Sequence, residues 1–249
     1  MEVHHHPDIR KKNLKEYVFE GLMIFMAVTM GFFAEKLREN LNEHSREKEF
    51  IITMIEDAQT DIQNIDKTID LNKIRVLKLD TIANRCFNYG SYRNNDASLY
   101  SIIKDCIMHP DFVSLVERTM IQLKNAGGMR LIQKTNAIES IIFYDEIGKK
   151  MVNQQDYYEY HLKVLLDATE HLFNMKYFPL NYQKFKWEVN IKEFSSAKLI
   201  SQDRNKIIEF GNKAKIFQGI IMFYIIRLEE AKEHANKLIE TLKKEYHIK

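Results

Sequence analysis

The clearest pattern of hydrophobic and polar positions begins with an apolar run over residues 17–34, which leads directly into a charged stretch. As a helix this run extends roughly 27 Å, close to the thickness of the hydrocarbon core of a bilayer. No charged side chain occurs between Gly21 and Ala34, and Glu20 lies near the end of the run, where a carboxylate can reach water. The pattern therefore predicts a transmembrane helix over residues 17–34.

Two other interpretations of this run stay open, a cleaved signal peptide and a core helix of a soluble fold. Basic residues precede the run, as they do in a signal peptide. Residues 31–34 (GFFA) are followed by Glu35 and Lys36, however, and this sequence is a poor cleavage site. We therefore favour an uncleaved single span in the inner (cytoplasmic) membrane, with the lipid bilayer as a partner of the chain.

Basic residues flank the run in equal number. They are Arg10, Lys11, Lys12 and Lys15 before it, and Lys36, Arg38, Arg46 and Lys48 after it. The first set is denser and has fewer acids around it, and positive charge favours the cytoplasmic side. We expect a short cytoplasmic tail over residues 1–16 and a large periplasmic domain.

A seven-residue hydrophobic repeat continues from the apolar run through the charged stretch, and no glycine or proline occurs from Phe32 to Tyr89. Alternating steps of three and four residues keep one phase from Glu20 to Cys86. The members that we take as the seam of the long helix are Ile51, Ile55, Ile62, Ile65, Ile69, Val76 and Leu79. Such a repeat predicts a coiled-coil-like or long bundle helix over residues 35–88. The acids beside the seam are expected on a solvated face; they are Asp57, Asp61, Asp66 and Asp70.

Small residues lie in the same phase within the predicted membrane helix. Ala27 and Gly31 are four residues apart, and Ala34 follows one turn later. Small residues at this spacing let two helix backbones approach closely in lipid. We therefore predict that Ala27, Gly31, Ala34 and the in-phase Glu20 face a second copy or another membrane protein.

For the remaining residues, 89–249, the sequence predicts a helical bundle that packs on the long helix. We expect a loop over 89–96, a helix from Asp96 or Ser98 to about residue 108, and helices over about 111–125 and 135–177. Residues 180–202 are either extended or a short helix, and a last helix covers about 203–246. Its apolar core, residues 216–226, is too short to span a bilayer and predicts a buried helix. The fold class is therefore all-α.

Glycine and cysteine positions add two expectations. Gly127 and Gly128 follow a predicted helix end, where a left-handed glycine is common, so we expect one of them to have positive φ. Cys86 and Cys106 are expected to be buried free thiols, although a disulfide stays open in an oxidising compartment.

Composition and motifs exclude several functions. The chain has 37 basic and 35 acidic residues, so it has no large positive charge that would attract nucleic acid. It contains no phosphate-binding glycine loop, no paired metal-ligand motif and no nucleophile elbow, so we predict no catalytic residue, cofactor or metal. The pairs Asp167 with His171 and Glu230 with His234 are expected to be surface pairs on a helix. A metal-binding role of residues 4–6 (HHH) is less favoured than an incidental one.

Two segments carry a family resemblance. At the start these are residues 1–7 (MEVHHHP), Tyr17, residues 31–35 (GFFAE) and the residues at 38–39, 43–44 and 46–48. Together with residues 122–132 (QLKNAGGMRLI), they resemble a group of uncharacterised bacterial single-pass membrane proteins. The resemblance covers the first fifty residues and the middle third of the chain. It implies a membrane anchor followed by a helical domain, and it suggests that the three histidines are native. It implies no activity.

Three classes of function are compatible with these patterns. The continuous seam and the absent catalytic motifs favour an anchored scaffold or assembly subunit that binds copies of itself or another membrane protein. A membrane-anchored sensor or ligand-binding bundle is the alternative, and it requires a pocket between helices. An enzyme, or a channel-like assembly that uses Glu20, is the third class.

Overall fold

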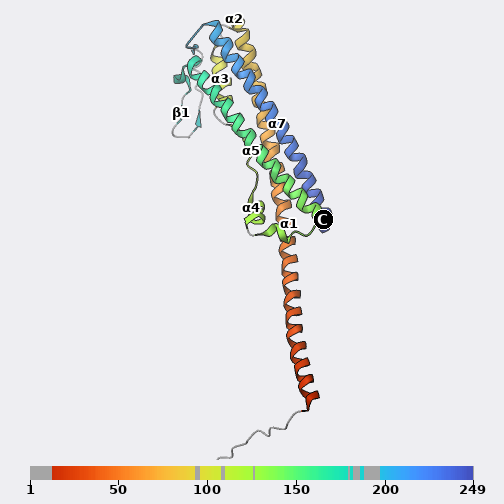
Figure 1. The fold of residues 1–249 in the computed structure, drawn as a ribbon. Coiled ribbons are helices and arrows are strands. Elements are labelled where there is room, and N and C mark those ends of the chain that lie inside the picture. Colours follow the sequence, from red (N-terminus) through yellow and green to blue (C-terminus); the bar gives the residue numbers. More distant parts are fainter. Residues whose placement is uncertain are drawn as a thin grey trace, which may run out of the picture. The chain divides into compact units, whose positions relative to one another are not determined.

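The computed structural model of the chain describes residues 13–92, 96–107, 110–125, 127–178, 180–181, 186–187 and 197–248. Its α-helices are α1 (Leu14–Phe87), α2 (Tyr89–Tyr92), α3 (Asp96–Ile107), α4 (Arg118–Asn125), α5 (Thr135–Leu172) and α7 (Arg204–Tyr246) (Figure 1). Two 3-10 helices, η1 (Gly128–Leu131) and η2 (Met175–Tyr177), and the antiparallel strands β1 (Leu180–Asn181) and β2 (Lys186–Trp187) complete it. This confirms the prediction of an all-α fold in which a long N-terminal helix precedes a helical bundle.

The chain divides into two compact units, residues 1–50 and residues 51–249, and α1 contributes residues to both. In the first unit, α1 exposes nearly all its side chains, apolar and charged alike. In the second unit, α1 has a stripe of buried side chains that repeats every seven residues. The stripe includes Ile51, Ile55, Ile65, Ile69 and Leu79, and Ile62 and Val76 are partly buried. The seven-residue pattern is therefore a packing pattern within the second unit.

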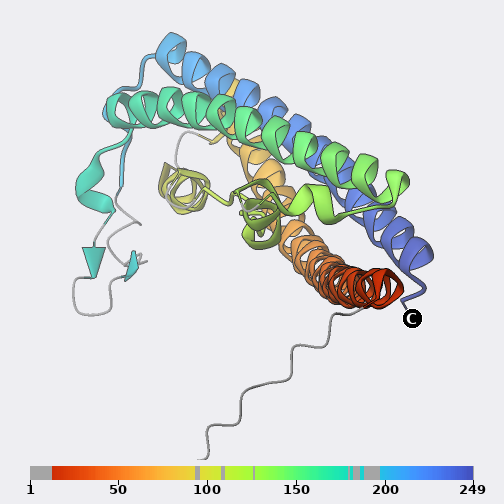
Figure 2. The ribbon, with the colours of Figure 1, turned by 60° about the horizontal axis from the view of Figure 1, so that its bottom comes forward.

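Helices α5 and α7 lie side by side in both views of the second unit (Figures 1 and 2). Large aromatic side chains fill the space that they share with α1. Tyr158 of α5 contacts Phe217 and Tyr224 of α7 edge to face, with ring centroids 5.1 and 5.5 Å apart. These three side chains are fully buried. Burying them removes a large apolar area from water, which is the main stabilising contribution to a bundle of this kind.

Glycine 211 allows α7 to approach the end of α1 closely. A Cβ atom at this position would lie 2.8 Å from Cys86 Cβ and 3.0 Å from the Phe87 ring. Contacts this short are not tolerated, so only glycine fits here. The pattern of hydrophobic positions gave no indication of this approach.

Several predicted boundaries are confirmed. Helix α3 begins at Asp96, and α7 begins after Asp203, whose carboxylate caps it by accepting a hydrogen bond from Asn205 N at 2.9 Å. Gly127 has φ of +63°, so one of the two paired glycines has the positive φ that was expected. Cys86 and Cys106 are both buried free thiols.

Other predictions need correction. The helix expected over 111–125 begins only at Arg118, and residues 110–117 have no regular structure. Helix α5 ends at Leu172 rather than near 177, because Phe173 turns into a buried cluster with Tyr100 and Phe210. The expected loop over 89–96 contains the helical turn α2. The apolar run 216–226 is buried on one side only, and Ile216 and Ile226 stay about half exposed.

Candidate functional site

The exposed apolar part of α1 is the first candidate. Among the described residues, α1 is the one helix long and apolar enough to cross a membrane, and none of its apolar window is buried. Phe25, Phe32 and Phe33 are each about 70% exposed. Water-exposed aromatic side chains in such number are unfavourable for a helix in aqueous solution. By length and composition, this stretch is thus able to cross a membrane.

The four residues predicted to form a membrane contact face all lie on this part of α1. Ala27, Gly31 and Ala34 are exposed, and Glu20 is partly exposed. A Cβ atom at Gly31 would meet no other group within 4 Å. The face is thus free of contacts from the rest of the chain at Gly31, and its role in self-association stays a prediction.

Two acids expected on a solvated face are instead buried in the second unit, so that prediction is wrong for Asp57 and Asp61. Asp61 is fully buried and accepts hydrogen bonds from Val116 N at 2.7 Å and Tyr144 Oη at 2.8 Å. Burial raises the pKa of Asp61, against the effect of these two hydrogen bonds, and the nearby carboxylate of Asp57 raises it further. Asp70 is exposed and Asp66 partly so, as expected.

Asp57 lies one turn before Asp61 and contacts the beginning of α4. Its carboxylate accepts hydrogen bonds from Thr119 N at 3.0 Å and Thr119 Oγ1 at 2.5 Å. Arg118 Nη2 lies 2.6 Å from its other oxygen. Asp57 therefore caps α4 from another helix, which is why a carboxylate is stable at this buried position.

A second polar cluster surrounds Arg75 on α1. Arg75 Nη2 lies 2.7 Å from Asp111 Oδ2, and its Nη1 donates to Tyr158 Oη at 2.6 Å. Asn72 Nδ2 donates to the Asp111 carbonyl oxygen at 2.9 Å. Burial raises the pKa of Tyr158 to about 12, so this phenol stays protonated. The cluster fixes Asp111 to α1 through one ion pair and one hydrogen bond.

Three of the buried polar residues of α1 follow a pattern that the sequence already contains. Asp61, Thr68 and Arg75 are spaced by seven residues, and all three are buried. Each directly precedes a residue of the seam in the sequence. The buried stripe of α1 is thus wider than the seam and includes a row of polar side chains. A polar side chain that recurs beside an apolar repeat at the same period was the signal that could have identified them.

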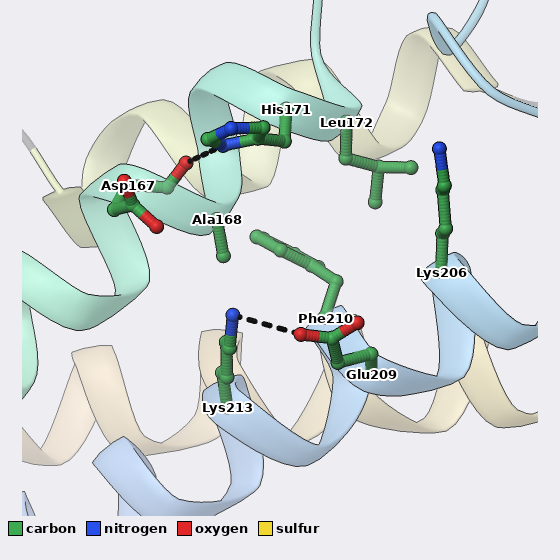
Figure 3. Close-up of a pocket in the computed structure, with 8 residues that line it drawn as sticks. All are labelled: Asp167, Ala168, His171, Leu172, Lys206, Glu209, Phe210 and Lys213. Carbon is green, nitrogen blue, oxygen red and sulfur yellow. Dashed lines mark hydrogen bonds and ion pairs between the residues drawn. The ribbon is translucent and has the colours of Figure 1, made fainter.

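A groove between the end of α5 and the start of α7 is a candidate site for a small ligand (Figure 3). Its volume is about 300 Å³, and Ala168, Leu172 and Phe210 form an apolar surface within it. Charged side chains of both signs surround this surface; they are Asp167, His171, Lys206, Glu209 and Lys213. Lys213 Nζ lies 3.0 Å from Glu209 Oε1 (Figure 3), so part of this charge is neutralised within the groove.

The helix-spaced pairs expected on the surface have different partners. His171 Nδ1 is hydrogen bonded to the main-chain oxygen of Asp167 at 2.8 Å, and not to its carboxylate (Figure 3). Glu230 accepts a hydrogen bond from Arg227 at 2.6 Å, and the His234 ring packs against Phe143. The prediction of side-chain pairing between these residues is therefore wrong.

The described ranges show neither a metal-holding cluster nor a reactive thiol. In those ranges no three His, Cys, Asp or Glu side chains are placed to hold a metal ion. Burial raises the pKa values of Cys86 and Cys106 to about 12, so neither thiol is a ready nucleophile. The histidines at 4–6 lie outside the described residues.

Known proteins offer no guide beyond this geometry. Comparison of the chain finds no matching family model, no matching curated protein and no matching solved structure.

Proposed function

We propose that the protein is a membrane-anchored helical scaffold or assembly subunit. The observation that carries this proposal is the contrast within α1. Residues 17–34 form an exposed apolar helix, whereas residues 51–87 bury their apolar side chains in the second unit. A bilayer satisfies the first part, since its hydrocarbon core solvates apolar side chains and an α-helix satisfies its own backbone polar groups.

Self-association through the membrane helix is the second element of the proposal. The face formed by Ala27, Gly31 and Ala34 has the small side chains that allow close backbone contact in lipid. Glu20 shares this phase and would lie near the membrane surface at the contact between copies. The partner that we propose is a second copy of this chain or another single-pass membrane protein.

A matched pair of glycines tests this contact. Gly31→Ile adds a branched side chain on the proposed face, and we expect it to abolish the chemically cross-linked oligomer of the full-length protein in membranes. Gly21→Ile places the same side chain in the same helix, outside the row of small residues, and should leave the oligomer unchanged. Equal yields of oligomer from both variants and the parent would exclude the proposed face.

The orientation that we propose has residues 1–16 in the cytoplasm and the second unit in the periplasm. It rests on the denser basic cluster before the membrane helix. A cysteine placed at the exposed Ser91 should react with a membrane-impermeant maleimide in intact cells. Reaction only after cell lysis would reverse the orientation.

The groove between α5 and α7 favours a second candidate, a ligand-binding or sensor bundle. It joins an apolar surface to charged groups of both signs, an arrangement suited to a small zwitterionic or amphipathic molecule. Phe210→Ala would remove the aromatic side chain that lines this apolar surface. If a small molecule that co-purifies with the parent is lost from this variant, the sensor function gains support over the scaffold.

A further inference from the structure

Residues 110–125, which we term the strap, are held in the second unit by side chains of three helices. Residues 110–117 have no helix or strand of their own to satisfy their backbone groups. Val113 N donates to Tyr224 Oη of α7 at 3.0 Å, and the Val113 carbonyl oxygen accepts from Gln155 of α5 at 2.7 Å. Buried backbone groups without such partners would be strongly unfavourable, so these side chains hold the strap in place.

Helix α1 supplies the remaining attachments of the strap. Asn72 and Arg75 hold Asp111 at one end, Asp61 holds Val116, and Asp57 holds the beginning of α4. Three of the four attachments thus include a carboxylate, but their partners differ. The carboxylates of Asp111 and Asp57 each meet an arginine, whereas Asp61 meets only neutral donors in the described part of the chain.

The charged groups around Asp61 do not compensate its charge. A cavity of about 120 Å³ beside Asp61 is lined by the charged side chains Glu117, Lys124, Asp145 and Lys149 and by Tyr144. Both lysines of this set are directed to Asp145, at 2.5 and 2.9 Å from its carboxylate oxygens. Arg118, which lies on the strap, is paired with Asp57. Within the described residues, Asp61 is therefore a fully buried carboxylate with no cation in contact, and the Asp57 carboxylate lies one turn away.

We propose that Asp61 is a proton-operated clasp, which holds the strap more firmly when its carboxyl group is protonated and loosens it when the group is ionised. Protonation keeps both attachments of the side chain. One oxygen still accepts from Val116 N–H, and the new O–H can donate to the Tyr144 oxygen, whose own hydrogen then turns away. Ionisation instead leaves a buried charge that only two neutral donors stabilise.

The direction of the pH effect follows from linkage. Burial raises the pKa of Asp61 in the closed strap, above the value of about 3.9 for an aspartate in an open chain. The closed state consequently binds the proton more tightly than the open state does. Acidification through the raised pKa stabilises the closed strap, and the gain is lost as the pH rises again.

Amide hydrogen exchange of the full-length protein in detergent micelles tests the clasp. Protection of strap residues 113–119 is measured from about pH 8 to about pH 4.5, a range that reaches close to the ordinary pKa of aspartate, with correction for intrinsic exchange rates. We expect protection to increase on acidification by up to about tenfold per pH unit, the limit for uptake of one proton. Residues 221–228 in the core of α7 serve as the internal reference.

Two variants make the test specific. Asp61→Asn removes the titration while it keeps a carbonyl oxygen for Val116, so protection of its strap should not change with pH. Asp70→Asn neutralises an exposed acid of the same helix and should keep the parent's pH profile. If the parent's strap shows no increase in protection on acidification, or if Asp61→Asn shows the same increase as the parent, the clasp is excluded. If Asp61→Asn fails to fold, the pH profile of the parent alone decides whether the clasp is excluded. Membrane attachment has no part in this readout, so its outcome does not depend on the scaffold proposal.

Discussion

Asp57 and Asp61 show how one helix can place like residues in opposite environments. Both belong to a set of four acids that recur along α1, and the two later members, Asp66 and Asp70, reach solvent. The difference lies in position around the helix. Asp57 and Asp61 lie where the strap, which includes α4, covers α1, and their oxygens accept hydrogen bonds from backbone N–H groups there. An identical side chain is thus structural at one turn and solvated at another.

A charge reversal distinguishes these two environments. Asp61→Lys places an ammonium group against Val116 N–H and removes the acceptor, so we expect a loss of more than about 3 kcal/mol in the free energy of unfolding. The same reversal at the exposed Asp70 should change it by less than about 0.5 kcal/mol. Denaturant unfolding of the two full-length variants, monitored by circular dichroism, measures the difference. Equal effects at both positions would mean that Asp61 is not buried.

At the scale of the elements, the long helices could be predicted from the sequence, but the irregular segment that packs across α1 could not. The start of α7 follows from a local signal, because Asp203 caps this helix within its own turn of chain. The start of α3 at Asp96 was also predicted, although the Asp96 carboxylate accepts a hydrogen bond from Leu199 N, 103 residues away in sequence. The irregular residues 110–117 have their hydrogen-bond partners on three helices up to 111 residues away in sequence. No local pattern contains that information. Local start and stop signals therefore predicted a helix from residue 111, where tertiary hydrogen bonds hold the irregular residues 110–117.

The close approach of α1 and α7 gives a prediction at the same scale. Gly211→Ala places a methyl group 2.8 Å from Cys86 Cβ, and we expect a loss of about 1–3 kcal/mol in the free energy of unfolding. Gly219→Ala in the same helix meets no group within 4 Å, and the higher helix propensity of alanine should stabilise it by up to about 1 kcal/mol. Thermal or denaturant unfolding of the two variants compares them directly. A stabilising effect at both positions would contradict the close approach.

At the scale of the whole molecule, the seven-residue pattern predicted the length of α1 but not which groups cover its apolar face. One phase runs from Glu20 to Cys86, yet it is buried only after residue 50. In the second unit the seam residues pack against the chain's own helices, as Ile65, Ile69 and Leu79 do in the main hydrophobic core. In the first unit the same phase meets no such core. Periodicity predicts that a face is covered, whereas composition decides whether lipid or protein covers it.

The central claim is that residues 17–34 anchor the protein in a bilayer, and extraction of membranes with alkaline carbonate tests it most directly. Alkaline carbonate releases peripheral proteins but not spanning helices, which apolar burial holds in the bilayer. We expect the full-length chain to stay in the membrane pellet, and a chain that begins at Leu37 to be soluble and helical. Ala27→Arg, which places a charge near the bilayer centre at a cost of about 2.5–3.5 kcal/mol, should reduce the retained fraction. Release of the full-length chain into the supernatant would contradict the account.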